Sequence, residues 1–232
     1  MARINKRALT KLEIVQEAMK QFLEKGYTAT TISAISKALG MSPGNLTFHY
    51  PTKEHLLSEL VNLLCEFQWT MMEKEAEDGF SSIMAICLEL TAMAGACEDD
   101  PIIKDFFLSS YSSPMCLEII RRNDKERAKK VFAEYCPNWT DVQFAEAEVL
   151  CSGIEYATLM TTGDAVPLET RIFGALHAIL RIYGVPEAVR ENKIQRVFAM
   201  DHRSIGKRVF VDFRAFVEQA TEEAFRDLLM NR

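Results

Sequence analysis

Residues 30–53 read TTISAISKALGMSPGNLTFHYPTK, and this stretch decides the fold. Its first half places three apolar residues at the three- and four-residue spacing of one helix face: Ile32, Ile35 and Leu39. Thr31 is placed to cap the start of this helix, and Gly40 permits the backbone that ends it. Ser42 can cap a second helix, where Pro43 at the first position sacrifices no hydrogen bond. The stretch therefore predicts two short helices joined by a tight turn.

Two helices joined so closely form a helix-turn-helix, whose second helix can enter the major groove of DNA while the first crosses the phosphates. Leu46 is expected to pack inward. The candidate DNA contacts lie on and around the second helix: Thr31, Ser42, Pro43, Gly44, Asn45, Thr47, Phe48, His49 and Lys53. Capped helix pairs also occur in bundles that bind no DNA, so the spacing alone leaves that alternative open.

Charge favours the DNA-binding interpretation. Residues 1–11, MARINKRALTK, hold four basic side chains and no acid. Residues 1–60 carry eight Lys and Arg against five Asp and Glu, although the whole chain has a net charge of −6. Basic charge beside a recognition helix can neutralise phosphates, so the N-terminal part is suited to DNA and the remainder is not.

The same region matches a known pattern at many positions: Ile14, Ala18, Phe22, Gly26, Thr30, Thr31, Ile32, Ile35, Gly40, Met41, Ser42, Gly44, Asn45, Leu46, His49, Tyr50, Lys53, Glu54, Leu56 and Leu57. With these residues, 11–57 resembles the N-terminal DNA-binding domain of the TetR family of bacterial transcriptional regulators. The resemblance implies a three-helix DNA-binding domain and a homodimer on a palindromic operator. Thr47 stands where the family usually has tyrosine, and its hydroxyl has a shorter reach toward phosphate.

Beyond the helix-turn-helix, the pattern is helical throughout, and alternation of strand type is absent over any useful length. The predicted helical segments are 54–77, 80–98, 101–110, 115–135, 140–162, 167–183, 187–200 and 204–230. The expected fold is all-α, with a helix-turn-helix domain at 1–52 and a helical ligand-binding and dimerisation domain at 53–232. The helix that begins near Lys53 would connect the two and transmit a shift between them.

The second domain is rich in soft apolar side chains, most of which a bundle of this size needs for its core. The candidates for a ligand pocket are Trp69, Met72, Met93, Phe106, Phe107, Tyr111, Tyr156 and Met160. The expected ligand is a small apolar or amphipathic effector.

By the family resemblance, the segments 140–162 and 167–183 would form the dimer interface. The second carries a wide apolar band: Leu168, Ile172, Ala175, Leu176, Ile179, Leu180, Ile182 and Tyr183. Gly153, Ala157 and Gly174 would allow helices to approach closely. A fully buried central helix is the alternative reading of the band. Residues 186–232 predict two further helices packed on the regulatory domain.

No catalytic, metal or cofactor site is expected. His177 and His202 have no nucleophile at matched spacing, and the pairs Glu146 with Glu148 and Glu222 with Glu223 resemble solvated helix faces. None of the six cysteines forms a C-x-x-C pair or lies near a histidine at zinc spacing. No apolar run approaches the length that crosses a bilayer, and no signal peptide is evident. We therefore expect a cytoplasmic protein with no membrane partner.

The sequence therefore leads to the hypothesis of a transcriptional regulator, and we expect a repressor. It would bind double-stranded operator DNA as a homodimer, and a small effector would release it. Two alternatives on the same fold remain open, a transcriptional activator and a thiol-based redox regulator. The second would need exposed thiols of low pKa, for which Cys97 is poorly placed beside acids and Cys136 is better placed. A helical adaptor that binds no DNA is the alternative outside this class.

Overall fold

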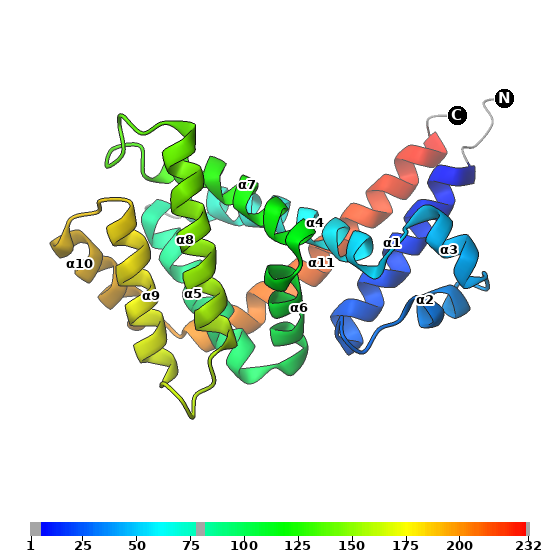
Figure 1. Ribbon diagram of the computed structural model, residues 1–232, viewed down its shortest axis with the longest axis horizontal. Helices are drawn as coiled ribbons and strands as arrows, with labels where there is room; N and C mark the ends of the chain where they lie inside the picture. Colours follow the sequence, from blue (N-terminus) through cyan, green and yellow to red (C-terminus); the bar gives the residue numbers. More distant parts are fainter. Residues whose placement is uncertain (1–5, 78–81, 231–232) are drawn as a thin grey trace.

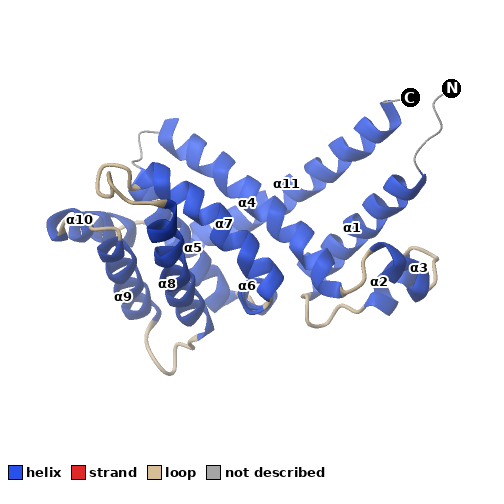
Figure 2. Ribbon diagram, turned by 45° about the horizontal axis from the view of Figure 1, so that its top comes forward, coloured by secondary structure: helices blue, strands red, loops and turns tan. Residues whose placement is uncertain are grey.

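The computed structural model describes residues 6–77 and 82–230, and within these ranges every regular element is a helix (Figure 1; Figure 2). The helices are α1 (Lys6–Lys25), α2 (Ile32–Ala38), α3 (Pro43–His49), α4 (Lys53–Glu77), α5 (Ser82–Asp99), α6 (Pro101–Ser112), α7 (Pro114–Val131), α8 (Asp141–Met160), α9 (Leu168–Ile182), α10 (Glu187–Phe198) and α11 (His202–Met230). The all-α prediction is confirmed.

Helices α1 to α3 form the helix-turn-helix unit, shown in blue in Figure 1. Ile35 of α2 and Leu46 of α3 are fully buried, as their spacing predicts. The Thr31 hydroxyl accepts a hydrogen bond from the Ala34 amide at 3.0 Å and caps α2. Gly40 has a φ of +64°, which ends α2 in the left-handed conformation that favours glycine. The local signals therefore place both helices correctly.

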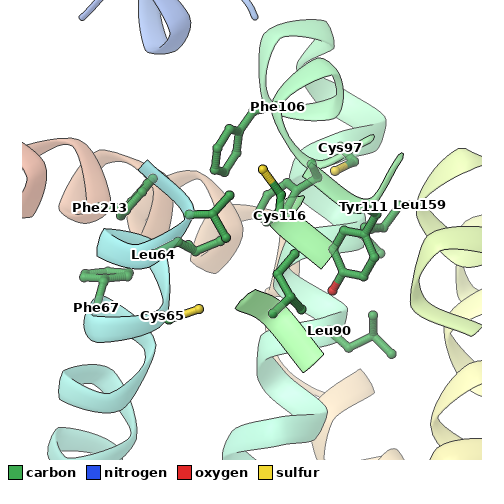
Figure 3. Close-up of a cluster of buried hydrophobic side chains, with 14 of the residues drawn as sticks. Leu64, Cys65, Phe67, Leu90, Cys97, Phe106, Tyr111, Cys116, Leu159 and Phe213 are labelled. Atoms are coloured by element: carbon green, nitrogen blue, oxygen red, sulfur yellow. The ribbon is translucent and has the colours of Figure 1, made fainter. Parts of the chain in front are cut away.

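The other helices form a body in which α5 is largely buried. Aromatic rings from three helices fill the part of this body nearest the helix-turn-helix. The Phe67 ring of α4 lies 5.5 Å from that of Phe213 on α11, which lies 6.0 Å from Phe106 of α6. Figure 3 shows these rings with Leu64 among them. One apolar cluster thus joins helices that are distant in sequence.

Helix α11 matches the predicted segment 204–230 closely, but it packs on more of the molecule than the regulatory domain on which the sequence prediction places it. It begins against α5, where a Cβ at Gly206 would collide with the Ala92 carbonyl oxygen, so glycine allows the two helices to pack closely. Its later turns leave the body and lie along α1, with the two helices running in opposite directions (Figure 1; Figure 2). Residues 186–230 therefore pack on the helix-turn-helix unit as well as on the body.

One predicted boundary is wrong. The segment expected to be helical to residue 135 ends as α7 at Val131, because Phe132 caps the helix and a turn follows in which the Cys136 amide donates to the Phe132 carbonyl. Over residues 6–77 and 82–230, no helix combines the length and apolar character needed to span a membrane.

Candidate nucleic-acid interface and regulatory cavity

Helix α3 presents one face to the core and the opposite face to solvent. Leu46 is fully buried and fixes the inward face. Pro43, Gly44 and Asn45 are exposed at the start of the helix, and the Phe48 side chain is 68% exposed one turn later. The candidate contacts on this helix therefore share a surface that a DNA groove could accept.

Basic side chains of α1 lie beside this surface. The Arg7 guanidinium lies 5.4 Å from the centre of the Phe48 ring, and the Lys11 ammonium lies 5.4 Å from the centre of the Tyr50 ring. Lys6 also belongs to α1, so the basic segment predicted beside the recognition unit is helical from residue 6. Its earlier arginine, Arg3, lies outside the described residues.

Three hydroxyls of the predicted site have local partners. Thr31 and Ser42 each accept a backbone N–H at a helix start, so each hydroxyl proton remains able to bond an external acceptor. The Thr47 hydroxyl donates to the Gly44 carbonyl at 3.2 Å, within its own helix. Thr31 and Ser42 are therefore better placed than Thr47 to donate to a phosphate.

Lys53 has a role inside the protein that the sequence did not reveal. Its ammonium donates to the carbonyls of Tyr27 at 2.7 Å and Thr30 at 2.9 Å, and lies 4.0 Å from the centre of the Tyr27 ring. Desolvation by burial lowers the pKa of this lysine. Lys53 thus ties the start of α4 to the segment between α1 and α2. His49, at the end of α3, has a buried Nδ1 without a hydrogen-bond partner among the described residues.

A second contact to the α1–α2 segment comes from α6. The Asp105 carboxylate accepts hydrogen bonds from the Thr28 amide, at 2.8 Å, and from the Thr28 hydroxyl. Gly26, with a φ of +91°, brings the turn close to this carboxylate. Thr28 and Asp105 are 77 residues apart, so no local sequence pattern could have predicted this hydrogen bond. The body therefore contacts the helix-turn-helix unit directly, as well as through α4. We refer to this unit, α1 to α3, as the reading unit below.

A cavity of about 250 Å³ lies between α4, α5, α6 and α11. Its lining is mainly apolar and includes Leu64, Phe67, Met93, Phe107, Val209 and Phe213. Charged side chains also border it, among them Lys74 and Arg208. A mostly apolar cavity with a few polar groups has the usual character of a small-molecule site.

The predicted pocket residues divide between this cavity and other places. Met93 and Phe107 line the cavity, and Tyr111 lines a smaller polar one beyond Met93. The Met72 side chain lies outside what the structure describes. Tyr156, which is partly buried, lines neither of these two cavities.

The three remaining predicted pocket residues, Trp69, Phe106 and Met160, line neither of these two cavities. The Trp69 ring N–H donates to Asn123 at 2.7 Å, and the Lys130 ammonium lies 4.2 Å from its ring centre, so this side chain is bound to α7. Phe106 is fully buried among aromatic rings. Met160 is 51% exposed at the end of α8. Apolar composition identified these residues but could not distinguish core and surface from cavity.

A buried charged cluster lies beside the smaller cavity. Arg127, whose side chain is 5% exposed, forms ion pairs with Glu89 of α5 and with Asp124 at 3.1 Å. Burial, with a further contribution from Asp124, raises the pKa of Glu148 to about 8, and this carboxyl accepts a hydrogen bond from the Tyr183 hydroxyl. The prediction that Glu148 lies on a solvated helix face is therefore wrong, because α9 and α7 cover it.

Helices α8 and α9 both expose apolar side chains to solvent. The exposed residues are Val142, Val149, Leu150, Met160 and Phe173. Gly153 and Gly174, on the same helices, have no atoms within 4 Å of where a Cβ would lie. The apolar band predicted to face a second subunit is instead mostly buried in the core of the chain, including Leu168, Ile172, Ala175, Leu176, Ile179 and Leu180.

The six cysteines are all buried and unbridged. Burial raises the pKa of Cys65, Cys87 and Cys97 to about 12, and raises that of Cys136, whose thiol donates to the Tyr183 carbonyl. Thiols with raised pKa values inside a core are poor nucleophiles. Among the residues in 6–77 and 82–230, no group of three or more His, Cys, Asp or Glu could hold a metal ion.

Residues 14–60 match the family model described as "Bacterial regulatory proteins, tetR family". The chain is 37% identical over 65 residues to the HTH-type transcriptional regulator QacR of Staphylococcus aureus. This match covers 28% of this chain and 34% of that protein. It is 30% identical over 69 residues to the biofilm operon icaADBC negative transcriptional regulator IcaR of Staphylococcus epidermidis, covering 30% of this chain and 37% of that protein. These matches span about a third of the length of the curated relatives.

The fold is also similar to that of Thermus thermophilus FadR, a TetR family transcriptional repressor solved in complex with lauroyl-CoA. The TM-score is 0.55 at 17% sequence identity, and the likeness covers 73% of this chain and 93% of that one. At this identity the likeness establishes a shared fold.

Proposed function

This chain belongs to the TetR family of bacterial regulatory proteins, and we propose that it binds a palindromic DNA operator as a homodimer and releases it when a small effector occupies the body. The observation that carries the proposal is the division of α3 between buried Leu46 and the exposed face at Pro43, Gly44 and Asn45, flanked by basic α1. Repression in the cytoplasm is the expected outcome of operator binding.

In the proposed complex, different groups supply affinity and specificity. The Thr31 and Ser42 hydroxyls donate to phosphates while they cap their helices, and Lys6 and Arg7 add positive charge. Asn45 is the exposed amide on α3 that can pair with a base edge in the major groove. Lys53 contributes mainly by fixing the α1–α2 segment, since two of its donors already bond carbonyls.

The proposed dimer uses the exposed face of α8 and α9. Leu150, Gly153 and Ala157 form one exposed stripe on α8, and Phe173 with Gly174 forms another on α9. Small residues between apolar ones allow close helix packing, and a second copy would cover both stripes by twofold symmetry. Two reading units related in this way would match half-sites roughly 34–36 Å apart, or a multiple of that distance.

The proposed effector site is the cavity of about 250 Å³, which suits a small apolar or amphipathic molecule. Ile103 and Phe107 of α6 line this cavity, and Asp105 between them holds Thr28 of the reading unit. A ligand that displaces the inner face of α6 therefore acts on the turn that precedes α2. Differential affinity for two such arrangements is what allosteric release requires.

Helix α11 offers a second connection from the same cavity. Val209 and Phe213 form part of the cavity wall, and Val217 and Thr221, one and two turns further along, lie in the groove between α11 and α1. A shift of the wall is thus carried by one continuous helix to the reading unit. Because all six thiols are buried, we propose control by a ligand and not by thiol oxidation.

The test begins with duplexes selected by the full-length protein from a randomised pool. Asn45→Ala should weaken binding by about tenfold or more, because a bidentate amide-to-base contact contributes roughly 1–3 kcal/mol. Affinity should also fall steeply as salt rises, because counterions are released from neutralised phosphates. Asn192→Ala, which changes an exposed asparagine on α10, is the matched control and should bind as the unmodified protein does. Selection of no duplex, or binding that salt does not weaken, would refute the proposal.

Repression is tested separately with the selected operator placed across a promoter. Transcription in vitro should fall when the protein is added and recover with Asn45→Ala. A rise in transcription would instead identify an activator on the same fold.

A further inference from the structure

Gly44 is a glycine that the fold itself does not require. It is the second residue of α3, its φ is not positive, and a Cβ built on it would meet nothing within 4 Å. Glycine within a helix is less stable than alanine, so its presence here has a local cost that no internal contact explains. What it provides is bare backbone on the exposed face of the recognition helix, where another molecule can approach closely.

Phe48 lies one turn after Gly44 and three residues after Asn45, so the three positions share a helix face. At 68% exposure, Phe48 is the most exposed of the large hydrophobic side chains in the described part of the chain. Its neighbour Leu46 is fully buried, so α3 has no need of Phe48 to hold its place in the core.

The Phe48 ring is nevertheless held in position. The Arg7 guanidinium lies 5.4 Å from its centre, and the His49 ring meets it edge to face at 5.3 Å and 84°. The adjacent charge is basic, with Arg7, Lys6 and Lys11 on the neighbouring helix. The apolar ring can contact an apolar group, and the basic side chains around it favour a polyanion. Together they suit an apolar group on DNA better than the surface of another protein.

We propose that Phe48 recognises thymine, with its ring packed against the C5 methyl group in the major groove. Of the four bases, thymine is the one that exposes a methyl group in the major groove. Phenylalanine is one of the side chains that contact this methyl group. Gly44 lets the helix backbone approach the base edges, and Asn45 bonds an adjacent base. This inference rests on the proposed operator binding and adds the identity of one base in each half-site.

The test replaces each thymine of a selected operator, one at a time, by deoxyuridine, which lacks only the methyl group. For the unmodified full-length protein, one position in each half-site should lose about fourfold in affinity, the loss expected for one buried methyl group. Phe48→Ala should bind the thymine operator more weakly and show no further loss with deoxyuridine at that position. Val211→Ala, which truncates a similarly exposed apolar side chain on α11, should retain the full methyl effect.

The outcomes separate this inference from the function on which it rests. If the protein binds its selected operator but no thymine shows a methyl effect that Phe48→Ala abolishes, thymine recognition is overturned and operator binding stands. If Phe48→Ala binds every duplex as the unmodified protein does, the ring makes no DNA contact and the inference is again overturned. If the unmodified protein selects no duplex, both proposals fail together. Circular dichroism of Phe48→Ala should match that of the unmodified protein, because the side chain is outside the core.

Discussion

The reading unit and the body use charge in opposite ways. In the reading unit, the exposed side chains of Arg7 and Lys11 lie over the rings of Phe48 and Tyr50, where a polyanion can reach the two charges. In the body, the buried Arg127 lies between the partly buried carboxylates of Glu89 and Asp124, and the buried carboxyl of Glu148 accepts a hydrogen bond from Tyr183. Surface charge can attract a partner with little effect on stability, whereas buried charge is strongly coupled to folding. The two halves should therefore respond differently to mutation and to pH.

The largest expected effect is in the body. Arg127→Met should lower the free energy of unfolding by about 3 kcal/mol, because it leaves the partly buried carboxylates of Glu89 and Asp124 without their cation. Urea unfolding followed by circular dichroism measures the change. Lys129→Met, which breaks exposed ion pairs with Glu126 and Asp141, should lower the free energy of unfolding far less than Arg127→Met does, because water screens these charges. Equal losses in the two variants would remove the contrast.

The second effect concerns the outer face of the body. If α8 forms the proposed dimer interface, Leu150→Glu should shift the proposed dimer toward monomer by about 2–3 kcal/mol, because a carboxylate would be buried without a partner between subunits. Sedimentation velocity over a concentration series measures this equilibrium. Val211→Glu changes an apolar side chain of similar exposure on α11 and should leave the dimer intact. A dimer that tolerates Leu150→Glu would show that α8 lies outside the interface.

A pH effect should also come from the body. The pKa of Glu148 is raised by burial to about 8, so between the ordinary carboxyl pKa and pH 8 the folded state holds a proton that the unfolded state has lost. This contribution to stability is complete at low pH and disappears as pH rises through about 8. Between pH 6 and pH 8 the free energy of unfolding should fall by about 1–3 kcal/mol, and Glu148→Gln should flatten that slope. A slope unchanged by Glu148→Gln would assign the effect to other groups.

The smallest effect is expected where the two regions meet. Asp105→Asn replaces one of the two acceptor oxygens that hold Thr28, so the loop should open more often while the core is unaffected. Hydrogen exchange of the Thr28 amide should accelerate by about tenfold, corresponding to one lost hydrogen bond to a charged group. Peptides from α9 should exchange at their original rate. Unchanged exchange at Thr28 would show that α6 does not restrain the reading unit.

The comparison also explains what could be predicted from sequence. The helix-turn-helix depends on signals within 24 residues, the Thr31 and Ser42 caps, the Gly40 turn and the spacing of Ile35, and all of these could be read directly. The order of the helices in the body followed in the same way, because each break has its own proline, glycine or capping residue.

Contacts between distant segments could not be read in this way. Asp105 and Thr28 are 77 residues apart, and Arg127 and Glu89 are 38 apart. The sequence predicts a surface position for Glu148 because it is charged and pairs with Glu146, while the residue that covers it, Tyr183, lies 35 positions away. The division of apolar residues among core, cavity and outer face likewise depends on which helices pack together, as Met93 and Met160 illustrate.

The position of α11 along α1 bears on how such regulators could be recombined. Exchanging residues 1–52 for another reading unit would preserve the junction at α4 yet discard the surface of α1 that α11 covers. Met19 and Leu23, which border the groove with Val217, would be replaced by side chains that never evolved beside this helix. A chimera of this kind would need its last helix redesigned together with its first, because α1 and α11 pack against each other.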